Sequence, residues 1–182
     1  MVSCYIGLTA DLNVKTLAIR GPARYTIPMS ARLIISRARP VDVAAATELF
    51  GAYQDFYGVD ADASRIRAFV TDRLRLNDTI FLIARYEDTP THQGLGFAQM
   101  IPKLSSTAMR RNWVLNDLFV APEHRRRGIA MALMEECLAF AKRTGATQMS
   151  LKTQAANAGA RALYEREGWE LDEEFVTYSV KV

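Results

Sequence analysis

The pattern of apolar and polar positions is clearest in residues 113–145, where it predicts a strand, a turn and a helix in succession. Residues 113–120 are apolar except at Asn116 and Asp117, and such a run is typical of a strand covered on both faces of its sheet. Apolar residues return over 129–141 at helical spacing, and Thr144-Gly145 supplies the end of the helix. We expect the rest of the chain to be organised around this segment.

Before this segment the pattern predicts a strand, two helices and a hairpin. Pro40 and Asp42 open the first helix and Gly58 closes it. The predicted elements are a strand over 32–38, helices over 40–58 and from Asp62 or Ser64 to Asn77, and antiparallel strands over 79–86 and 94–101. Residues 102–112 are polar and predict a long loop, which is either a plain connection or part of an acceptor site.

After the central helix, the pattern predicts a strand over 148–153 and a short helix that Asn157 caps and Gly168 ends. Residues 169–171 and 175–182 are then expected to finish as strands. At the other end, Gly21-Pro22 and Pro28 interrupt any regular element. We therefore predict an N-terminal extension of unknown role over residues 1–28 and a single domain over residues 29–182.

Composition narrows the class of protein. The chain has 182 residues, 49% hydrophobic and 24% charged, which is typical of one globular domain. A net charge of +3, from 23 basic and 20 acidic residues, is too even to indicate a nucleic-acid partner. No apolar run approaches the ~20 residues of a membrane-spanning helix. Cys4 and Cys137 lie far apart, so we expect a packed thiol at Cys137 and a reducing, cytoplasmic setting.

The turn between the central strand and helix carries the most specific chemistry. It reads Arg125-Arg-Arg-Gly-Ile-Ala130, and the first amides of a helix have no partners within the helix, so they attract anions. Gly128 permits close approach to the backbone, and three arginines favour a diphosphate group. The alternative is a solvated charge run that opens an ordinary helix. Neither the GxGxxG fingerprint nor a P-loop is present.

Two segments in order resemble the motifs of one family. The pattern RxxGxA over 125–130, preceded by Leu118-Phe-Val-Ala-Pro122, resembles the acetyl-CoA-binding segment of the GNAT N-acetyltransferase superfamily. Residues 157–169, which read NAGARALYEREGW, are similar to the family pattern NxxAxxLYxxxGF. The resemblance extends less specifically over residues 32–182. It implies an α/β fold with a mixed, mostly antiparallel sheet, a splayed parallel strand pair and flanking helices.

The resemblance also implies acetyl-CoA as co-substrate and no metal. Residues expected to bind acetyl-CoA are Leu118, Phe119, Val120, Arg125, Arg126, Arg127, Gly128, Ile129, Ala130, Asn157 and Tyr164. Tyr164 is expected to protonate the departing thiolate, and an amide of Phe119 or Val120 to meet the oxyanion. Asn116-Asp117 stands where related enzymes tend to carry Glu-Asp, which leaves Asp117 as the candidate base or amine binder, or as a buried structural aspartate.

The acceptor stays open at this stage. Polyamines, aminoglycosides, amino acids and a protein lysine all fit, and a homodimer remains open as an assembly. Tyr53, Phe56 and Tyr57 of the first predicted helix either pack in the core or, as the resemblance implies, belong to a first pair of helices that walls the acceptor pocket. Two other classes compete with an acetyltransferase, namely a non-catalytic acyl-CoA-binding regulatory domain and a nucleotide- or phosphate-binding module that uses only the arginine turn.

Overall fold

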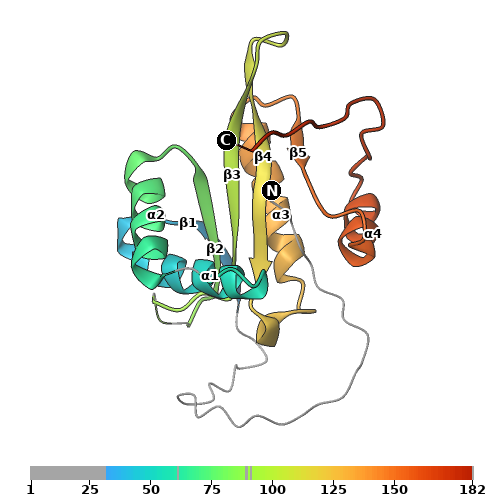
Figure 1. Cartoon of the computed structure of the whole chain (residues 1–182). Coiled ribbons are helices and arrows are strands. Elements are labelled where there is room, and N and C mark those ends of the chain that lie inside the picture. The colour runs from blue at the N-terminus through green and yellow to red at the C-terminus, as the bar shows by residue number, and fades with distance from the viewer. Residues whose placement is uncertain (1–31, 61, 89, 91, 182) are drawn as a thin grey trace.

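The structure is a computed structural model that describes residues 32–60, 62–88, 90 and 92–181 (Figure 1). The predicted extension over residues 1–28 and the thiol of Cys4 lie outside the described residues. No helix in the described part of the chain is long and apolar enough to cross a membrane.

A five-stranded sheet in the order β1-β2-β3-β4-β5 forms the centre of the fold. Its first three junctions are antiparallel, and only β4 and β5 run parallel. The strands are β1 (Leu33–Arg37), β2 (Ile80–Tyr86), β3 (Gly96–Ser105), β4 (Arg110–Val120) and β5 (Met149–Leu151). The predicted mixed, mostly antiparallel sheet with one parallel pair is therefore confirmed.

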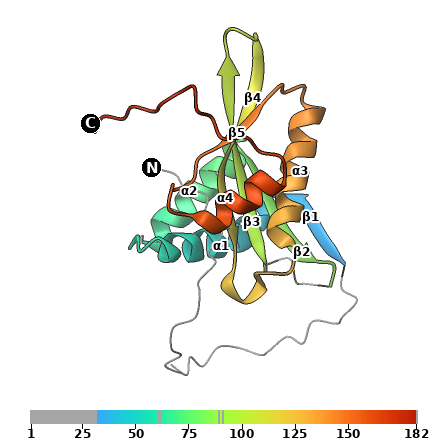
Figure 2. The same cartoon turned by 90° about the vertical axis from the view of Figure 1, so that its right-hand side faces the viewer.

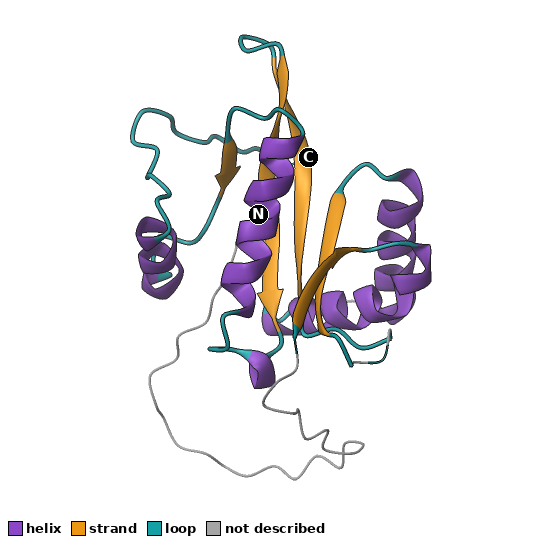
Figure 3. Cartoon of the chain, turned by 180° about the vertical axis from the view of Figure 1, so that it is seen from behind, coloured by secondary structure: helices purple, strands orange, loops and turns teal. Residues whose placement is uncertain are grey.

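Helices cover both faces of the sheet. The helical elements are η1 (Pro40–Asp42), α1 (Val43–Phe56), α2 (Ala63–Leu76), η2 (Pro122–His124), α3 (Ile129–Arg143) and α4 (Ala158–Arg166). Helices α1 and α2 pack on one face, where Phe81, Phe97 and Phe119 of the strands are buried. Helix α3 packs on the other face, which is the one seen in front in Figure 3. Helix α4 lies past the β5 edge of the sheet, to the right of α3 in Figure 1.

Local sequence signals explain where these helices begin and end. The stripe predicted for α3 is buried, including Leu133 and Cys137, and burying a side chain of leucine size contributes roughly 1.5–3 kcal/mol. Asp62 caps α2 by accepting a hydrogen bond from the Ser64 amide at 2.7 Å. Asn77 ends the same helix in the left-handed conformation, with φ 55°.

The prediction of a polar loop over residues 102–112 is wrong. Strands β3 and β4 continue past the sheet as a two-stranded ribbon, paired up to Ser105 and Arg110, which projects from the fold in Figure 1. Backbone pairing needs no apolar side chains, and a ribbon wet on both faces lacks the apolar alternation that marks a strand. Asn112 anchors its base, because its side-chain oxygen accepts hydrogen bonds from the Thr147 and Gln148 amides.

The prediction of strands over 169–171 and 175–182 is also wrong for the residues that the structure describes. Residues 170–181 are exposed and form no strand, and Figure 2 shows this segment running away from the sheet. Its strand-forming residues have no neighbouring strand with which to form backbone hydrogen bonds, and a strand is stable only when paired. Strand β5 is likewise shorter than the predicted range of 148–153.

Candidate functional site

A β-bulge in β4 determines where its polar residues point. The register pairs Leu115 with Met100 and Asp117 with Gln99, so Asn116 is an extra residue on β4. Side chains two residues apart on a regular strand share a face. The extra residue places Leu115 and Asp117 on opposite faces instead, with Leu115 toward α3 and Asp117 toward α1.

The same bulge lies where β4 and β5 part. Strand β5 pairs only with Trp113, Val114 and Leu115, and among the described residues no strand pairs with that edge of β4 further along. The chain after β5 leaves the sheet toward α4 (Figure 1). The edge of β4 over residues 118–120 therefore has no strand beside it among the described residues, and this stretch is here called the opening beside β4.

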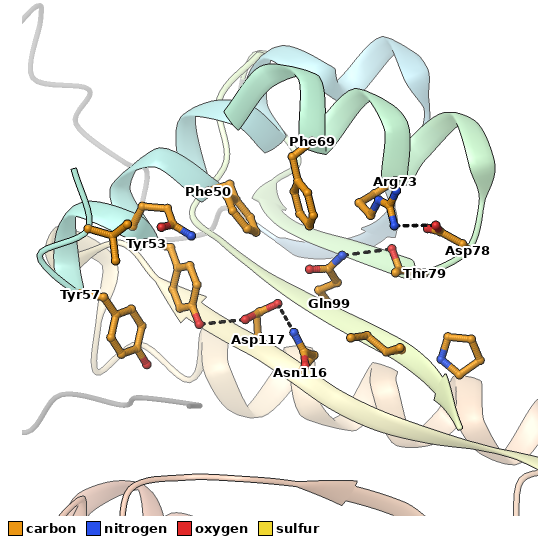
Figure 4. Close-up of a pocket in the computed structure, with 14 residues that line it drawn as sticks. Phe50, Tyr53, Tyr57, Phe69, Arg73, Asp78, Thr79, Gln99, Asn116 and Asp117 are labelled. Carbon is orange, nitrogen blue, oxygen red and sulfur yellow. Dashed lines mark hydrogen bonds and ion pairs between the residues drawn. The ribbon is translucent and has the colours of Figure 1, made fainter. Parts of the chain in front are cut away.

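One cavity, here called the Asp117 cavity, lies between α1, α2 and the strands β3 and β4 (Figure 4). Its volume is about 700 Å³. Aromatic side chains of the helices form one wall, and Gln99, Asn116 and Asp117 of the strands lie opposite. An ion pair of Arg73 Nη1 with Asp78 Oδ2, 2.6 Å apart, completes the lining.

Both oxygens of the Asp117 carboxyl group accept hydrogen bonds. The Tyr53 hydroxyl donates to Oδ1 at 2.8 Å, and the Asn116 side-chain amide donates to Oδ2 at 2.9 Å. Asp117 is 4% exposed, and this burial raises its pKa above the ordinary 3.8, while the two hydrogen bonds act in the opposite direction. A buried carboxyl group with a raised pKa is a better proton acceptor than an ordinary aspartate.

A second cavity, here called the Gly128 cavity, lies where β4 ends and α3 begins, with α4 opposite. Its volume is about 310 Å³. Gly128 has φ 77°, and a Cβ atom added there would meet nothing within 4 Å, so the backbone faces open space. Arg126 is also left-handed, with φ 60°. Such strained residues cluster at binding sites, and the amides that open α3 lie beside them.

The three arginines of this turn have different surroundings. Arg125 donates from Nε to the Val120 carbonyl at 3.0 Å, and its guanidinium lies 5.0 Å from the Phe56 ring centroid. Burial lowers the pKa of Arg125, and Glu123 opposes that shift. Arg125 therefore ties the turn to β4 and to the end of α1, whereas Arg126 and Arg127 are exposed.

His124 also lines the Gly128 cavity. Burial lowers its pKa below the ordinary 6.5, and Arg127 adds to the shift while Glu123 opposes it. Its imidazole is therefore neutral at pH 7, and the positive charge at this cavity comes from the arginines.

The structure brings together seven of the residues that the sequence nominated for the cofactor. The residues that line the Gly128 cavity are Leu118, Val120, Arg125, Arg126, Gly128, Ile129 and Ala130.

Four other nominated residues do not line that cavity. Phe119 packs on the face of α1 and α2, and Arg127 is exposed beside the turn. Asn157 caps α4, with Oδ1 accepting from the Ala160 amide at 3.2 Å. Tyr164 is 4% exposed, and its ring lies 6.1 Å from that of Trp169.

Sequence reasoning missed the α4 side of the Gly128 cavity. Gly159, Ala162, Leu163 and Arg166 line it, and their spacing of three, four and seven residues is the signature of one helical face. It also missed Gln99, a buried amide in the apolar first half of β3, whose polarity was the available signal. Gln99 lies opposite Asp117 in the register and donates to the Thr79 hydroxyl at 3.1 Å.

The aromatic residues Tyr53, Phe56 and Tyr57 have different surroundings, and Tyr53 also packs in the core beneath α1 and α2. Tyr53 and Tyr57 line the Asp117 cavity, whereas Phe56 is 37% exposed and lies under Arg125. Among the described residues, no group of three or more His, Cys, Asp or Glu side chains is arranged to hold a metal ion.

Comparison with known sequences gives one family. The profile of the acetyltransferase (GNAT) family matches residues 46–169. A protein of Bacillus subtilis (strain 168) named as an uncharacterized N-acetyltransferase, YhfO, is 36% identical over 148 residues, which cover 81% of this chain and 97% of that protein. A D-amino-acid N-acetyltransferase of Saccharomyces cerevisiae, HPA3, is 23% identical over 145 residues, covering 78% and 87% of the two chains.

Comparison with solved structures gives the same fold. The crystal structure of a probable acetyltransferase superposes with a TM-score of 0.77 at 32% identity, covering 82% of this chain and 97% of that one. An aminoglycoside acetyltransferase from an uncultured soil sample, in complex with sisomicin, superposes with a TM-score of 0.68 at 15% identity, covering 82% and 96%. At that identity the second likeness shows a shared fold alone.

Proposed function

The chain belongs to the GNAT acetyltransferase family, and from this premise we propose that it transfers the acetyl group of acetyl-CoA directly to a primary amine. The amine belongs to a small molecule of polyamine, aminoglycoside or amino acid type, or to a protein lysine. One observation carries the proposal: the bulged end of β4 borders both cavities, with Leu118 and Val120 in one and Asn116 and Asp117 in the other.

The Gly128 cavity fits the anionic part of acetyl-CoA. The opening amides of α3 and the positive end of its dipole favour a diphosphate group, and Gly128 leaves them uncovered. Arg126 and Arg166 line the cavity and are exposed, so they add positive charge. Acetyl-CoA, when bound, supplies an acetyl group activated as a thioester.

The opening beside β4 fits an extended chain. Main-chain groups of Leu118, Phe119 and Val120 would bind the pantetheine arm as an added strand does. Around it, the residues proposed to shape the site without lining the cavity themselves are Arg127 beside the turn and Asn157 at the start of α4.

Asp117 is the proposed proton acceptor or amine binder. A primary amine with a pKa of about 10.4 is almost fully charged at pH 7, and it must lose a proton before it attacks a thioester. The Asp117 carboxyl group lines the larger cavity, and burial raises its pKa. The larger cavity is therefore the proposed acceptor site.

Tyr164 is the proposed general acid. A phenol with a pKa of about 10 can donate a proton to a departing thiolate. Leu163, the residue before it on α4, lines the Gly128 cavity, which is the side from which the leaving group would depart. We also propose a cytoplasmic setting, with which the buried thiol of Cys137 is compatible.

Two glycines allow a controlled test of the cofactor site. Gly128 and Gly145 have φ 77° and 73°, and neither has an atom within 4 Å of an added Cβ, so valine strains both backbones alike. Calorimetry should show CoA affinity falling at least about tenfold in Gly128→Val, a change of ~1.4 kcal/mol, and holding in Gly145→Val. Equal affinities in two folded variants would contradict the site.

Thiol release decides between catalysis and mere binding. The unmodified chain should release CoA thiol from acetyl-CoA when amines are added. A chain that binds CoA and releases no thiol with any amine would instead be a regulatory acyl-CoA-binding domain. Tighter binding of ATP or NAD than of CoA would point to a nucleotide-binding module.

A further inference from the structure

The charges that line the Asp117 cavity are nearly balanced. Among its described lining residues, only Arg73, Asp78 and Asp117 carry formal charge. Arg73 and Asp78 are 2.6 Å apart and neutralise each other. Arg73 is also held against the wall, with its guanidinium 5.3 Å from the Phe69 ring centroid. Asp117 is thus the one lining carboxylate without a cationic partner in the cavity to balance its charge.

The wall opposite Asp117 is a continuous set of aromatic rings. Phe50 contacts Phe69 at 5.3 Å and Tyr53 at 5.8 Å between ring centroids. Tyr53 contacts Tyr57 at 4.9 Å in an edge-to-face arrangement. Figure 4 shows these rings on the helices, facing the strands that carry Asp117 and Gln99. Such a wall binds apolar and aromatic groups well, and its rings hold each other in place.

From the single uncompensated carboxylate and the aromatic wall we propose that the acceptor is a small molecule with a single ammonium group on an apolar body of aromatic size. This inference rests on the proposed acetyl transfer. The ammonium group meets Asp117, and the body lies against the rings of Phe50, Tyr53 and Phe69. Each additional ammonium group of a polyamine or an aminoglycoside would be desolvated without a carboxylate to meet it, which disfavours binding.

The size of the cavity favours a small molecule over a protein lysine. A volume of about 700 Å³ falls in the range of roughly 300–1,000 Å³ that is usual for small-molecule sites. The four-carbon stem of a lysine would leave the aromatic wall largely uncovered, whereas an aromatic body can lie against it.

The test compares acceptors with the full chain. Phenethylamine, spermidine, sisomicin and a lysine-containing peptide with a blocked N-terminus are each assayed for thiol release from acetyl-CoA. We expect kcat/KM for phenethylamine to exceed that for each of the others by at least about tenfold. A higher value for spermidine, sisomicin or the peptide would overturn the inference and leave the proposed acetyl transfer intact.

A complete lack of transfer would overturn the inference too. Calorimetry with CoA then shows whether the proposed acetyl transfer is contradicted as well. If CoA binds, the class of acceptor is wrong, and thiol release with a wider panel of amines decides whether the chain is a transferase for another acceptor or a regulatory acyl-CoA-binding domain. If CoA does not bind, the proposed acetyl transfer is wrong as well.

A pair of charge variants on α2 ties the preference to this cavity. Phe69 lines the cavity, and Ala68, its neighbour on the same helix, is exposed and lies outside the lining. Phe69→Asp removes one ring that the apolar body contacts and adds a second carboxylate for a second ammonium group. For both reasons the ratio of kcat/KM for spermidine to that for phenethylamine should rise about tenfold. Ala68→Asp adds the same charge outside and should change the ratio by less than about twofold. An equal change in both variants would contradict the inference.

Discussion

The protonation of Asp117 depends on two opposing influences. Burial raises the pKa of its carboxyl group, and hydrogen bonds from Asn116 and Tyr53 lower it, with burial the larger. A raised pKa means that the folded chain binds this proton more tightly than the unfolded chain does. The contribution of Asp117 to stability therefore falls as pH rises from 3.8 through the raised pKa. Transfer that needs the ionised carboxylate should increase over the same pH range.

Tyr53→Phe should move the pH profile of transfer. The substitution removes a hydrogen bond that lowers the pKa of Asp117 and keeps the ring, so the rising limb of kcat/KM should shift to higher pH. Tyr57→Phe is the control, because Tyr57 lines the same cavity and is not among the groups that shift this pKa. The assignment of Asp117 as base fails if the limb stays in place in Tyr53→Phe, or moves equally in both variants.

Tyr164→Phe tests the general acid. The ring that packs near Trp169 is kept, so CoA affinity should hold, and kcat should fall toward the lower end of the ~10²- to 10⁴-fold range of general acid catalysis. In the unmodified enzyme the advantage of the phenol should shrink at high pH, as it deprotonates. Full turnover in Tyr164→Phe, or a loss explained by weaker CoA binding, would leave Tyr164 as a packing residue.

At the scale of elements, the bulge in β4 links the two cavities. It turns Asp117 toward α1, and it lies one residue beyond Leu115, the last residue that β5 pairs. Because bulges bend and twist a strand, the extra residue accounts for both the direction of Asp117 and the opening beside β4.

Deleting Asn116 should close that opening. The register on either side of the bulge then becomes continuous, so β4 can straighten and pair with β5 further along, which should weaken CoA binding at least about tenfold without lowering the melting temperature. Asn116→Ala keeps the bulge, so it should bind CoA normally. Unchanged CoA affinity after the deletion would show that the opening does not depend on the bulge.

The sequence predicted the positions of the helices and strands better than it predicted irregularities such as the bulge and the ribbon. Apolar periodicity located α3, and caps located the ends of α2, because these signals are local. The bulge went unpredicted, although the apolar positions Leu115 and Leu118, three apart, both pack toward α3 and so break the two-residue period. The ribbon beyond the sheet and the unpaired segment over 170–181 went unpredicted because pairing depends on which strand lies alongside.

For the candidate site too, the sequence predicted what consecutive residues encode and not what depends on contacts between distant segments. The motifs located the turn at Gly128 because its backbone chemistry is encoded in consecutive residues. The Asp117 cavity is assembled from α1, α2, β3 and β4, which are distant in sequence. The sequence therefore nominated Asp117, the aromatic residues of α1 and the first two helices as a wall, without the individual residues of α2 and β3. That Gln99 and Arg73 line this cavity is evident only when the positions of the strands and helices are known.

At the scale of the whole molecule, the sheet separates two cavities. Helix α3 and α4 flank the Gly128 cavity, α1 and α2 cover the Asp117 cavity, and the end of β4 borders both. Such an arrangement allows a cofactor and an acceptor to approach from different sides. The central claim is therefore that binding of the cofactor and deprotonation of the amine belong to separate faces of one strand.

Asp117→Asn tests this claim most directly, with kcat/KM for the amine and the Kd for CoA measured on the same preparation. We expect kcat/KM to fall by ~10²- to 10⁴-fold, and the Kd for CoA to change by less than about twofold, because Asp117 does not line the Gly128 cavity. Transfer at the unmodified rate, or a loss of CoA binding as large as the loss of transfer, would contradict the account.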